Sequence, residues 1–99
     1  MSVTVVRQKV KDDTISEAVA AVRTLFEALD RAHPAGVRYA STRVADTSTF
    51  VAMFELAEGS EDPRPAMPEF GRFLEQLKEL VDGPPVIEQL EVVGSYNLF

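Results

Sequence analysis

The sequence predicts an α+β domain in which two helices cover one face of a four-stranded antiparallel sheet. Strand-like and helix-like apolar spacings alternate along the 99 residues in the order βαββαβ. The two middle strands are separated by Asp46–Ser48, a connection short enough to make them a hairpin. The stretch Thr49–Ala57 (TFVAMFELA) is apolar on both sides of a strand, so both faces of the sheet require cover there.

The first half of the chain predicts one strand and one long helix. Val3–Val10 is rich in Val and Thr, which favours a strand. Thr14 and Glu17 have the spacing of a capping box, and the apolar residues after them recur every three or four positions, as on one stripe of a helix. The helix is expected to end at His33–Gly36, because proline cannot continue it.

The second half predicts the hairpin, a loop, a second helix and a last strand. The hairpin strands are Val37–Ala45 and Thr49–Ala57, and Glu58–Pro68, with its three prolines, is expected to be an exposed loop. Apolar spacing predicts a helix over Glu69–Val81 and a strand over Val86–Tyr96. Two right-handed β-α-β units joined by a hairpin form the ferredoxin-like plait, expected here as a single domain over residues 1–99.

Composition excludes several classes of protein. No apolar run approaches the ~20 residues that a bilayer requires, and the net charge of −6 comes without a basic cluster for nucleic acid. Because the chain has no cysteine and a single His, we expect neither disulfides nor a metal site. The first residues do not have the pattern of an export signal, so we expect a cytoplasmic protein.

The sheet face that carries no helix is expected to pack against a second copy of the chain. The central strand leaves an apolar surface on that face, and a two-fold homodimer is the most economical way to bury it. Val51 is a candidate for this interface. The apolar tail residues Leu98 and Phe99 are expected to reach across to the partner subunit.

Four side chains that alternate along the hairpin strands are candidates for a ligand pocket: Tyr39, Arg43, Met53 and Glu55. A turn of odd length places Tyr39 opposite Glu55, whereas a two-residue turn places Tyr39 opposite Phe54 and splits the cluster. If the side chains share a face, they suit either a small polar aromatic ligand or a cross-strand polar network at the dimer interface.

Three aromatic residues are candidates for a hydrophobic pocket between the sheet and the second helix. Phe54, Phe70 and Phe73 have the spacing for this role, and the same spacing is typical of plain core. His33, at the end of the first helix, suits either a favourable contact with the helix dipole or acid–base chemistry.

The hairpin YASTRVADTSTFVAMFELA, followed by a loop and MPEFGRFLEQL, resembles the antibiotic biosynthesis monooxygenase-like group of the dimeric α+β barrel superfamily. Four positions match the pattern of that group in residue type: Arg43, Asp46, Phe50 and Glu55. Ala57 stands where the group has a Trp, and no His precedes Phe70. The resemblance implies a barrel built by two plaits and oxidation of a small aromatic, quinol-like compound without a metal or other cofactor.

Two hypotheses of function follow. The first is a monooxygenase-like enzyme that oxidises a small aromatic compound held between the sheet and the helices. The alternative is a non-catalytic dimeric domain, which either binds a small hydrophobic metabolite or contacts another protein through the acidic loop Glu58–Pro68. In both cases a second copy of the chain is an expected partner, and nucleic acid and membrane are not.

Overall fold

A computed structural model of the chain describes residues 2–98. Its strands and helices are β1 (Ser2–Lys9), α1 (Ile15–Ala32), β2 (Val37–Arg43), β3 (Thr49–Leu56), α2 (Pro68–Lys78) and β4 (Val86–Glu91). Two short 3-10 turns, η1 (Asp12–Thr14) and η2 (Arg64–Ala66), precede the two helices. Neither helix in this part of the chain is long and apolar enough to span a membrane.

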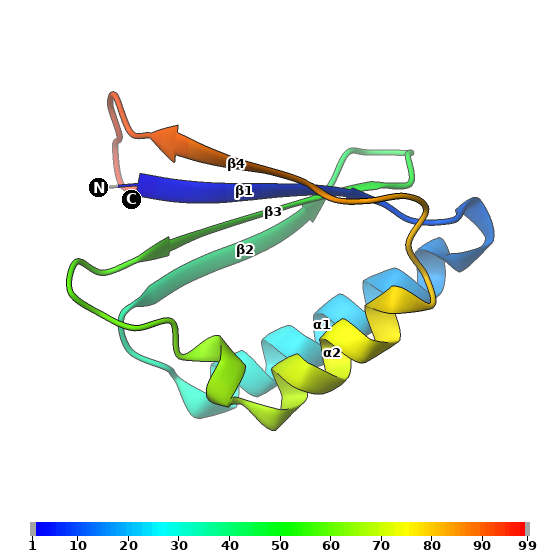
Figure 1. Ribbon diagram of the computed structural model, residues 1–99, viewed down its shortest axis with the longest axis horizontal. Coiled ribbons are helices and arrows are strands. Elements are labelled where there is room, and N and C mark those ends of the chain that lie inside the picture. The colour runs from blue at the N-terminus through cyan, green and yellow to red at the C-terminus, as the bar shows by residue number, and fades with distance from the viewer. Residues whose placement is uncertain (1, 99) are drawn as a thin grey trace.

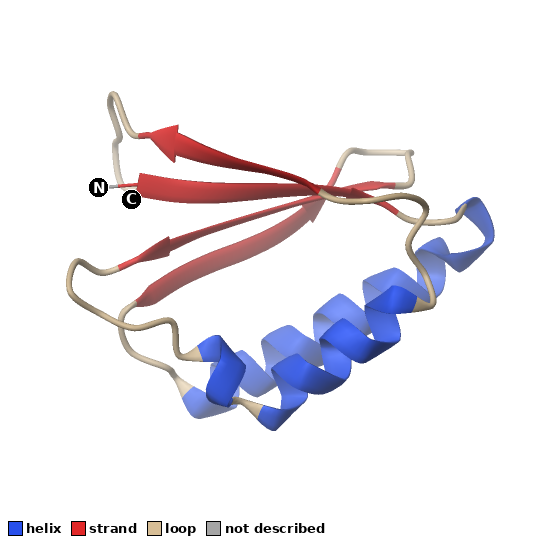
Figure 2. Ribbon diagram, viewed as in Figure 1, coloured by secondary structure: helices blue, strands red, loops and turns tan. Residues whose placement is uncertain are grey.

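The strands form one antiparallel sheet in the order β2-β3-β1-β4, and both helices lie against the same face of it (Figure 1). Figure 2 shows the resulting two layers, with the sheet above and the helix pair below. This order, with β1 and β3 in the centre, is that of the ferredoxin-like plait. The predicted fold class is therefore confirmed, whereas pairing into a dimer remains a prediction.

Register places Tyr39 opposite Phe54 and Arg38 opposite Glu55. The Val44 amide donates to the Thr49 carbonyl at 2.9 Å, so the turn between them contains four residues rather than two or three. Side chains alternate between the two faces of a strand, so Tyr39 and Glu55 lie on opposite faces of the sheet. Of the two registers that the sequence left open, the structure has the one that splits the polar cluster.

Several local predictions were wrong, and the β2 strand ends at Arg43 rather than Ala45. The α2 helix ends at Lys78 rather than Val81, because Val81 pairs with Val10 in an isolated bridge. The β4 strand ends at Glu91 rather than Tyr96, because its partner there is Ser2, where β1 begins. Thr14 makes no capping box: its hydroxyl lies 2.8 Å from the carbonyl oxygen of Lys11 and 3.1 Å from that of Leu80.

The buried face of α1 carries small side chains. Its four buried residues recur every three or four positions: Ala18, Ala21, Leu25 and Ala28. Alanine fills little of the space between two layers, so α1 alone cannot fill the layer under the sheet. The remaining space lies between the sheet and the two helices.

Candidate functional site

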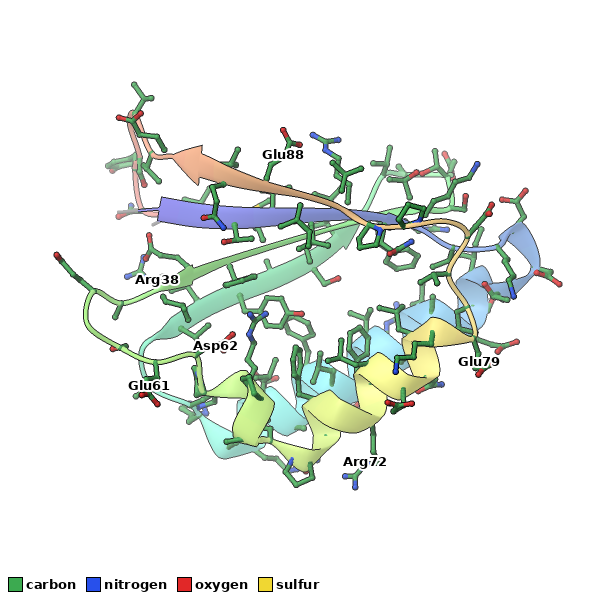
Figure 3. All side chains as sticks on the ribbon, in the orientation of Figure 1. Arg38, Glu61, Asp62, Arg72, Glu79 and Glu88 are labelled. Atoms are coloured by element: carbon green, nitrogen blue, oxygen red, sulfur yellow. The ribbon has the colours of Figure 1, made fainter. Side chains whose placement is uncertain are left out.

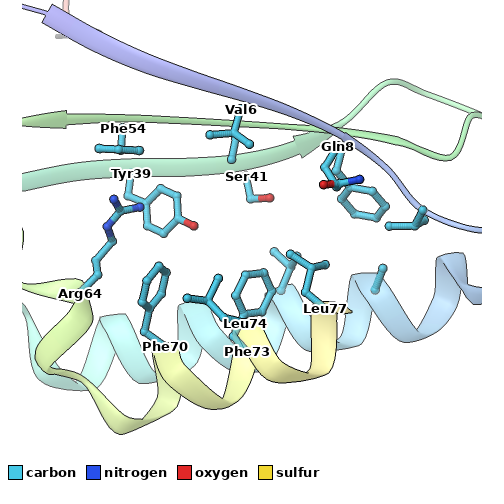
Figure 4. Close-up of a pocket in the computed structure, with 15 residues that line it drawn as sticks. Val6, Gln8, Tyr39, Ser41, Phe54, Arg64, Phe70, Phe73, Leu74 and Leu77 are labelled. Atoms are coloured by element: carbon cyan, nitrogen blue, oxygen red, sulfur yellow. The ribbon is translucent and has the colours of Figure 1, made fainter. Parts of the chain in front are cut away.

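A cavity of about 230 Å³ lies between the sheet and the helices (Figure 4). Fifteen residues from both layers line it: Val6, Gln8, Val10, Ala18, Val22, Tyr39, Ser41, Phe50, Ala52, Phe54, Arg64, Phe70, Phe73, Leu74 and Leu77. Most of these side chains are apolar, as is usual for a site that holds a small molecule.

The two walls of the cavity differ in polarity. The α2 wall is entirely apolar, because the helix turns Phe70, Phe73, Leu74 and Leu77 inward at helical spacing. The sheet wall carries polar groups, since Tyr39 and Ser41 alternate on β2; both hydroxyls point into the cavity in Figure 4. Among the described residues, the Ser41 hydroxyl has no hydrogen-bond partner, so it is available to a ligand.

Gln8 adds a further polar group at the end of the cavity opposite Arg64 (Figure 4). Its amide nitrogen donates to the carbonyl oxygens of Lys9 at 2.8 Å and Gly83 at 3.1 Å. These two hydrogen bonds fix the orientation of the Gln8 side-chain amide. The amide oxygen is an acceptor that neither of these bonds uses.

Arg64 closes the near end of the cavity and is 6% exposed. Its guanidinium carbon lies 3.7 Å from the ring centroid of Phe54, 4.8 Å from that of Tyr39 and 5.1 Å from that of Phe70. Contacts of this kind attract a cation to the faces of aromatic rings. The guanidinium is therefore held in place by rings from the sheet and from α2.

Asp62 compensates the buried charge of Arg64. The Nε atom of Arg64 donates to Oδ1 of Asp62 at 2.9 Å, and its Nη2 donates to Oδ2 at 2.7 Å, which is a two-point ion pair. The hydrogen bond from Arg64 lowers the pKa of Asp62. Burial is the largest single effect on Arg64 and opposes its charge, but the hydrogen bond and the charge of Asp62, together with Tyr39, outweigh it, so the pKa of Arg64 is raised. Both groups are therefore charged at neutral pH.

Tyr39 lies beside this ion pair on the sheet wall. Its ring is 4.9 Å from that of Phe26 on α1 and meets the ring of Phe54 edge-on at 6.2 Å. Burial raises the pKa of Tyr39, and the nearby charge of Arg64 opposes this effect without cancelling it. The phenol therefore keeps its proton at neutral pH and acts as a hydrogen-bond donor.

The structure brings four of the predicted pocket residues together in this cavity: Tyr39, Phe54, Phe70 and Phe73. The other three do not line it. Arg43 is exposed near the hairpin turn, where its Nη1 atom lies 3.4 Å from the carbonyl oxygen of Thr47. Met53 and Glu55 point to the face of the sheet that carries no helix, because they alternate with the cavity residues of β3.

Glu55 is buried on that helix-free face and is 8% exposed. Its Oε2 atom has no hydrogen-bond partner among the described residues. A buried carboxylate oxygen without a partner is costly.

Arg64 could not be identified from the sequence, because the prediction of an exposed loop over Glu58–Pro68 was wrong at this position. The segment folds under the sheet and buries the arginine, with Asp62 and Pro63 partly buried beside it. The spacing Asp62-Pro63-Arg64 was the available signal. The carboxylate of Asp62 also accepts a hydrogen bond from the backbone amide of Arg64 at 3.0 Å. Asp favours turns of this type, in which its side chain binds the backbone amide two residues further along the chain.

His33 has a structural role at the end of α1. It adopts a left-handed conformation (φ 47°), its amide donates to the Leu29 carbonyl at 2.9 Å, and its ring Nδ1 lies 2.6 Å from the Asp30 carbonyl oxygen. It lies outside the cavity lining. Among the described residues, no group of His, Cys, Asp and Glu side chains has the arrangement of a metal site.

The strand order and the cavity define this protein as a ferredoxin-like α+β domain with a site between its layers. The same fold occurs in a provisionally assigned antibiotic biosynthesis monooxygenase from Nitrosomonas europaea, at a TM-score of 0.76 and 19% identity over 95% of this chain and 100% of that one. A provisionally assigned member from Caulobacter crescentus CB15 matches at 0.74 and 21% identity over 94% of this chain and 90% of its own. One from Chloroflexus aurantiacus J-10-fl matches at 0.73 and 9% identity over the full length of both chains.

No family model matches this chain, and no curated protein matches it either. Identities of 9–21% show a shared fold rather than a shared activity. The resemblance predicted from the sequence is confirmed at the level of the fold.

Proposed function

We propose that this protein is a monooxygenase-like domain that binds a small quinol-like aromatic compound in the cavity and oxidises it with dioxygen. The observation that carries the proposal is the cavity itself, with its aromatic lining, its apolar helix wall and its row of polar groups on the sheet. The antibiotic biosynthesis monooxygenases that share the fold support the type of reaction.

The reaction balances without a bound cofactor when the substrate is a hydroquinone. Dioxygen takes four electrons from the hydroquinone: one oxygen atom enters a ring C–H bond, and the other leaves as water with the two hydroxyl protons. The product is a hydroxyquinone. No external reductant is required, because the substrate supplies all the electrons.

In this proposal Arg64 and Tyr39 act on the ionised substrate. A hydroquinone gives electrons to dioxygen more readily once it has lost a proton, and a nearby guanidinium and phenol donor stabilise the resulting oxyanion. The described residues of the lining include no carboxylate or imidazole to take the proton. The substrate therefore loses its proton to water, and oxidation is expected to accelerate with rising pH.

Oxygen uptake tests this function directly. The purified protein is supplied with naphthalene-1,4-diol in an oxygen electrode, and the rate without protein is subtracted. Arg64→Met is expected to lower the protein-dependent rate about 10–100-fold, the loss typical of one charge-assisted contact. Arg72→Met is the matched control, because Arg72 projects outward from α2, away from the sheet (Figure 3). An uptake rate equal to that without protein, across a series of hydroquinones, would refute the enzymatic proposal.

The alternative function is binding of a small aromatic compound without turnover. The lack of an acid–base group in the described lining favours it. Saturable binding of naphthalene-1,4-diol under nitrogen, together with no oxygen uptake in air, would support this alternative.

We further propose that the helix-free face packs against a second copy of the chain. Val51 is partly buried on this face, and the β4 residues Val86 and Leu90 are 55% and 44% exposed. Leu98 is 67% exposed in the tail, and Phe99 lies outside the described residues. Exposed apolar side chains gathered on one face are typical of an interface. Sedimentation at micromolar concentration is expected to give a dimer, and a monomer would contradict the proposal.

A further inference from the structure

We infer that the ligand of this cavity is a one- or two-ring aromatic acid whose carboxylate replaces Asp62 as the partner of Arg64. The inference depends on the proposed function in placing the ligand in the same cavity, and it does not depend on the oxidation. It assigns a chemical class to the ligand and identifies Asp62 as the group that the ligand replaces.

The size of the cavity limits the ligand. An apolar cavity of about 150 Å³ holds benzene, and drug-sized ligands occupy about 300–1,000 Å³. The 230 Å³ here lies between these values. A single ring with substituents or a bicyclic compound fits, whereas a molecule of three or four fused rings requires the walls to separate.

The charge of the cavity favours an acid. Among the described lining residues, Arg64 alone is charged at neutral pH. Its Nε and Nη2 atoms donate to Asp62, so Nη1 is outside the two-point ion pair. The Tyr39 ring centroid lies 4.8 Å from the guanidinium carbon and the Tyr39 hydroxyl points into the cavity, so Arg64 and the phenol are both donors at this end of the cavity. A carboxylate accepts two such donors well.

Arg64 is fixed more firmly than Asp62, and this difference allows the exchange. The Arg64 side chain is 8% exposed and is in contact with aromatic rings from two layers, whereas the Asp62 side chain is 26% exposed and belongs to the loop. A ligand carboxylate that binds Arg64 compensates the guanidinium in place of Asp62, whose side chain then turns toward water. An incoming anion thus replaces one carboxylate with another, and the guanidinium stays paired throughout.

The apolar wall completes the recognition. With the carboxylate at Arg64, the rings extend along α2 past Phe73 and Leu74 toward Leu77, and the edge opposite these side chains meets the hydroxyl of Ser41. An aromatic acid with an oxygen substituent on that edge matches both walls.

A comparison of the affinities of two probes tests the inference. The probes are 2-naphthoate and 2-naphthamide, which have nearly the same shape and differ in charge, and their binding is measured by calorimetry under nitrogen. The protein is expected to bind the acid at least tenfold more tightly than the amide. Asp62→Asn keeps the shape of the side chain but removes the competing charge, so the acid is expected to bind at least fivefold more tightly than in the unaltered protein, with little change for the amide.

Two further variants separate a specific role from a structural one. Arg64→Met is expected to bring the ratio of acid to amide affinity close to one, and Arg72→Met, which removes an exposed arginine, is expected to leave the ratio unchanged. If Arg64→Met does not fold, Asp62→Asn alone decides the matter. An equal affinity for both probes in the unaltered protein, or an unchanged ratio in Asp62→Asn, would overturn the inference.

The outcome is separate from that of the oxygen-uptake experiment. Preference for the acid without oxygen consumption would leave the ligand class standing and would refute the oxidation. Oxidation of neutral hydroquinones without any preference for the acid probe would support the oxidation and would refute the ligand class.

Discussion

Replacing Asp62 with alanine is expected to lower the free energy of unfolding by about 2–3 kcal/mol. Removal of one partner of a fully buried ion pair costs about 3–5 kcal/mol, because the other charge is left without compensation. The Arg64 side chain meets this condition at 8% exposure, but the Asp62 side chain is 26% exposed, so water replaces part of the lost contact. For a domain of this size the change corresponds to a fall of about 10–20 °C in the melting temperature.

Urea and thermal unfolding at a fixed protein concentration measure the effect, and two comparisons identify its cause. Glu75→Ala breaks an exposed ion pair with Lys78, whose side chains are 74% and 70% exposed, and is expected to cost less than about 0.5 kcal/mol. The double variant Asp62→Ala with Arg64→Met is expected to be more stable than Asp62→Ala alone, since it removes the uncompensated charge. If Asp62→Ala were no more destabilising than Glu75→Ala, the reasoning about the buried pair would be wrong.

Three further predictions concern stability. The pKa of Asp62 is lower in the folded protein than in the unfolded chain, where it is about 4. The stabilising effect of Asp62 is therefore complete above the unfolded pKa and is lost as the pH falls through the folded pKa. The difference in unfolding free energy between the unaltered protein and Asp62→Asn is expected to shrink on titration from pH 5 to about 2. Glu55→Met is expected to stabilise an isolated subunit by about 1 kcal/mol in urea unfolding, because it removes a buried carboxylate oxygen that has no partner among the described residues. A loss of stability that grows with protein concentration would instead indicate that Glu55 has a partner across the interface. Gly36→Ala is expected to lower the melting temperature of the protein more than Gly59→Ala does. Both glycines have a positive φ (82° and 78°), but a methyl group at Gly36 meets the Ser60 hydroxyl at 3.0 Å, whereas the space at Gly59 is open. Equal melting temperatures of the two variants would contradict this prediction.

The architecture was predictable because it depends on patterns within short segments. The short apolar run in Thr49–Ala57 identifies a strand, and the HPAG segment that follows Ala32 ends the first helix within one residue of the expected position. Element ends were less predictable, since β4 stops where its neighbour does and not where its own sequence changes. The end of a strand is a property of the pair.

The candidate site was predictable in part for the same reason. Phe70 and Phe73 reach the cavity through helical spacing, and Tyr39 through its place on β2. Whether Glu55 joined them depended on a hairpin register that turn chemistry sets, and composition leaves that register open. Arg64 was beyond reach because its burial arises from how a loop folds under the sheet, a long-range effect in a segment whose prolines and charges are typical of exposed chain.

The sheet order has a consequence for how the chain folds. β1 is a central strand, yet its pairing with β4 joins residues far apart in the sequence, such as Val5 and Glu88, while its pairing with β3 joins Val5 to Met53. Closing longer loops costs more entropy and slows folding. β1 is therefore paired along both of its edges only once β4 has been synthesised. Until then the backbone N–H and C=O groups along one edge of β1 have no strand partner, and in this period the chain is most exposed to misassembly.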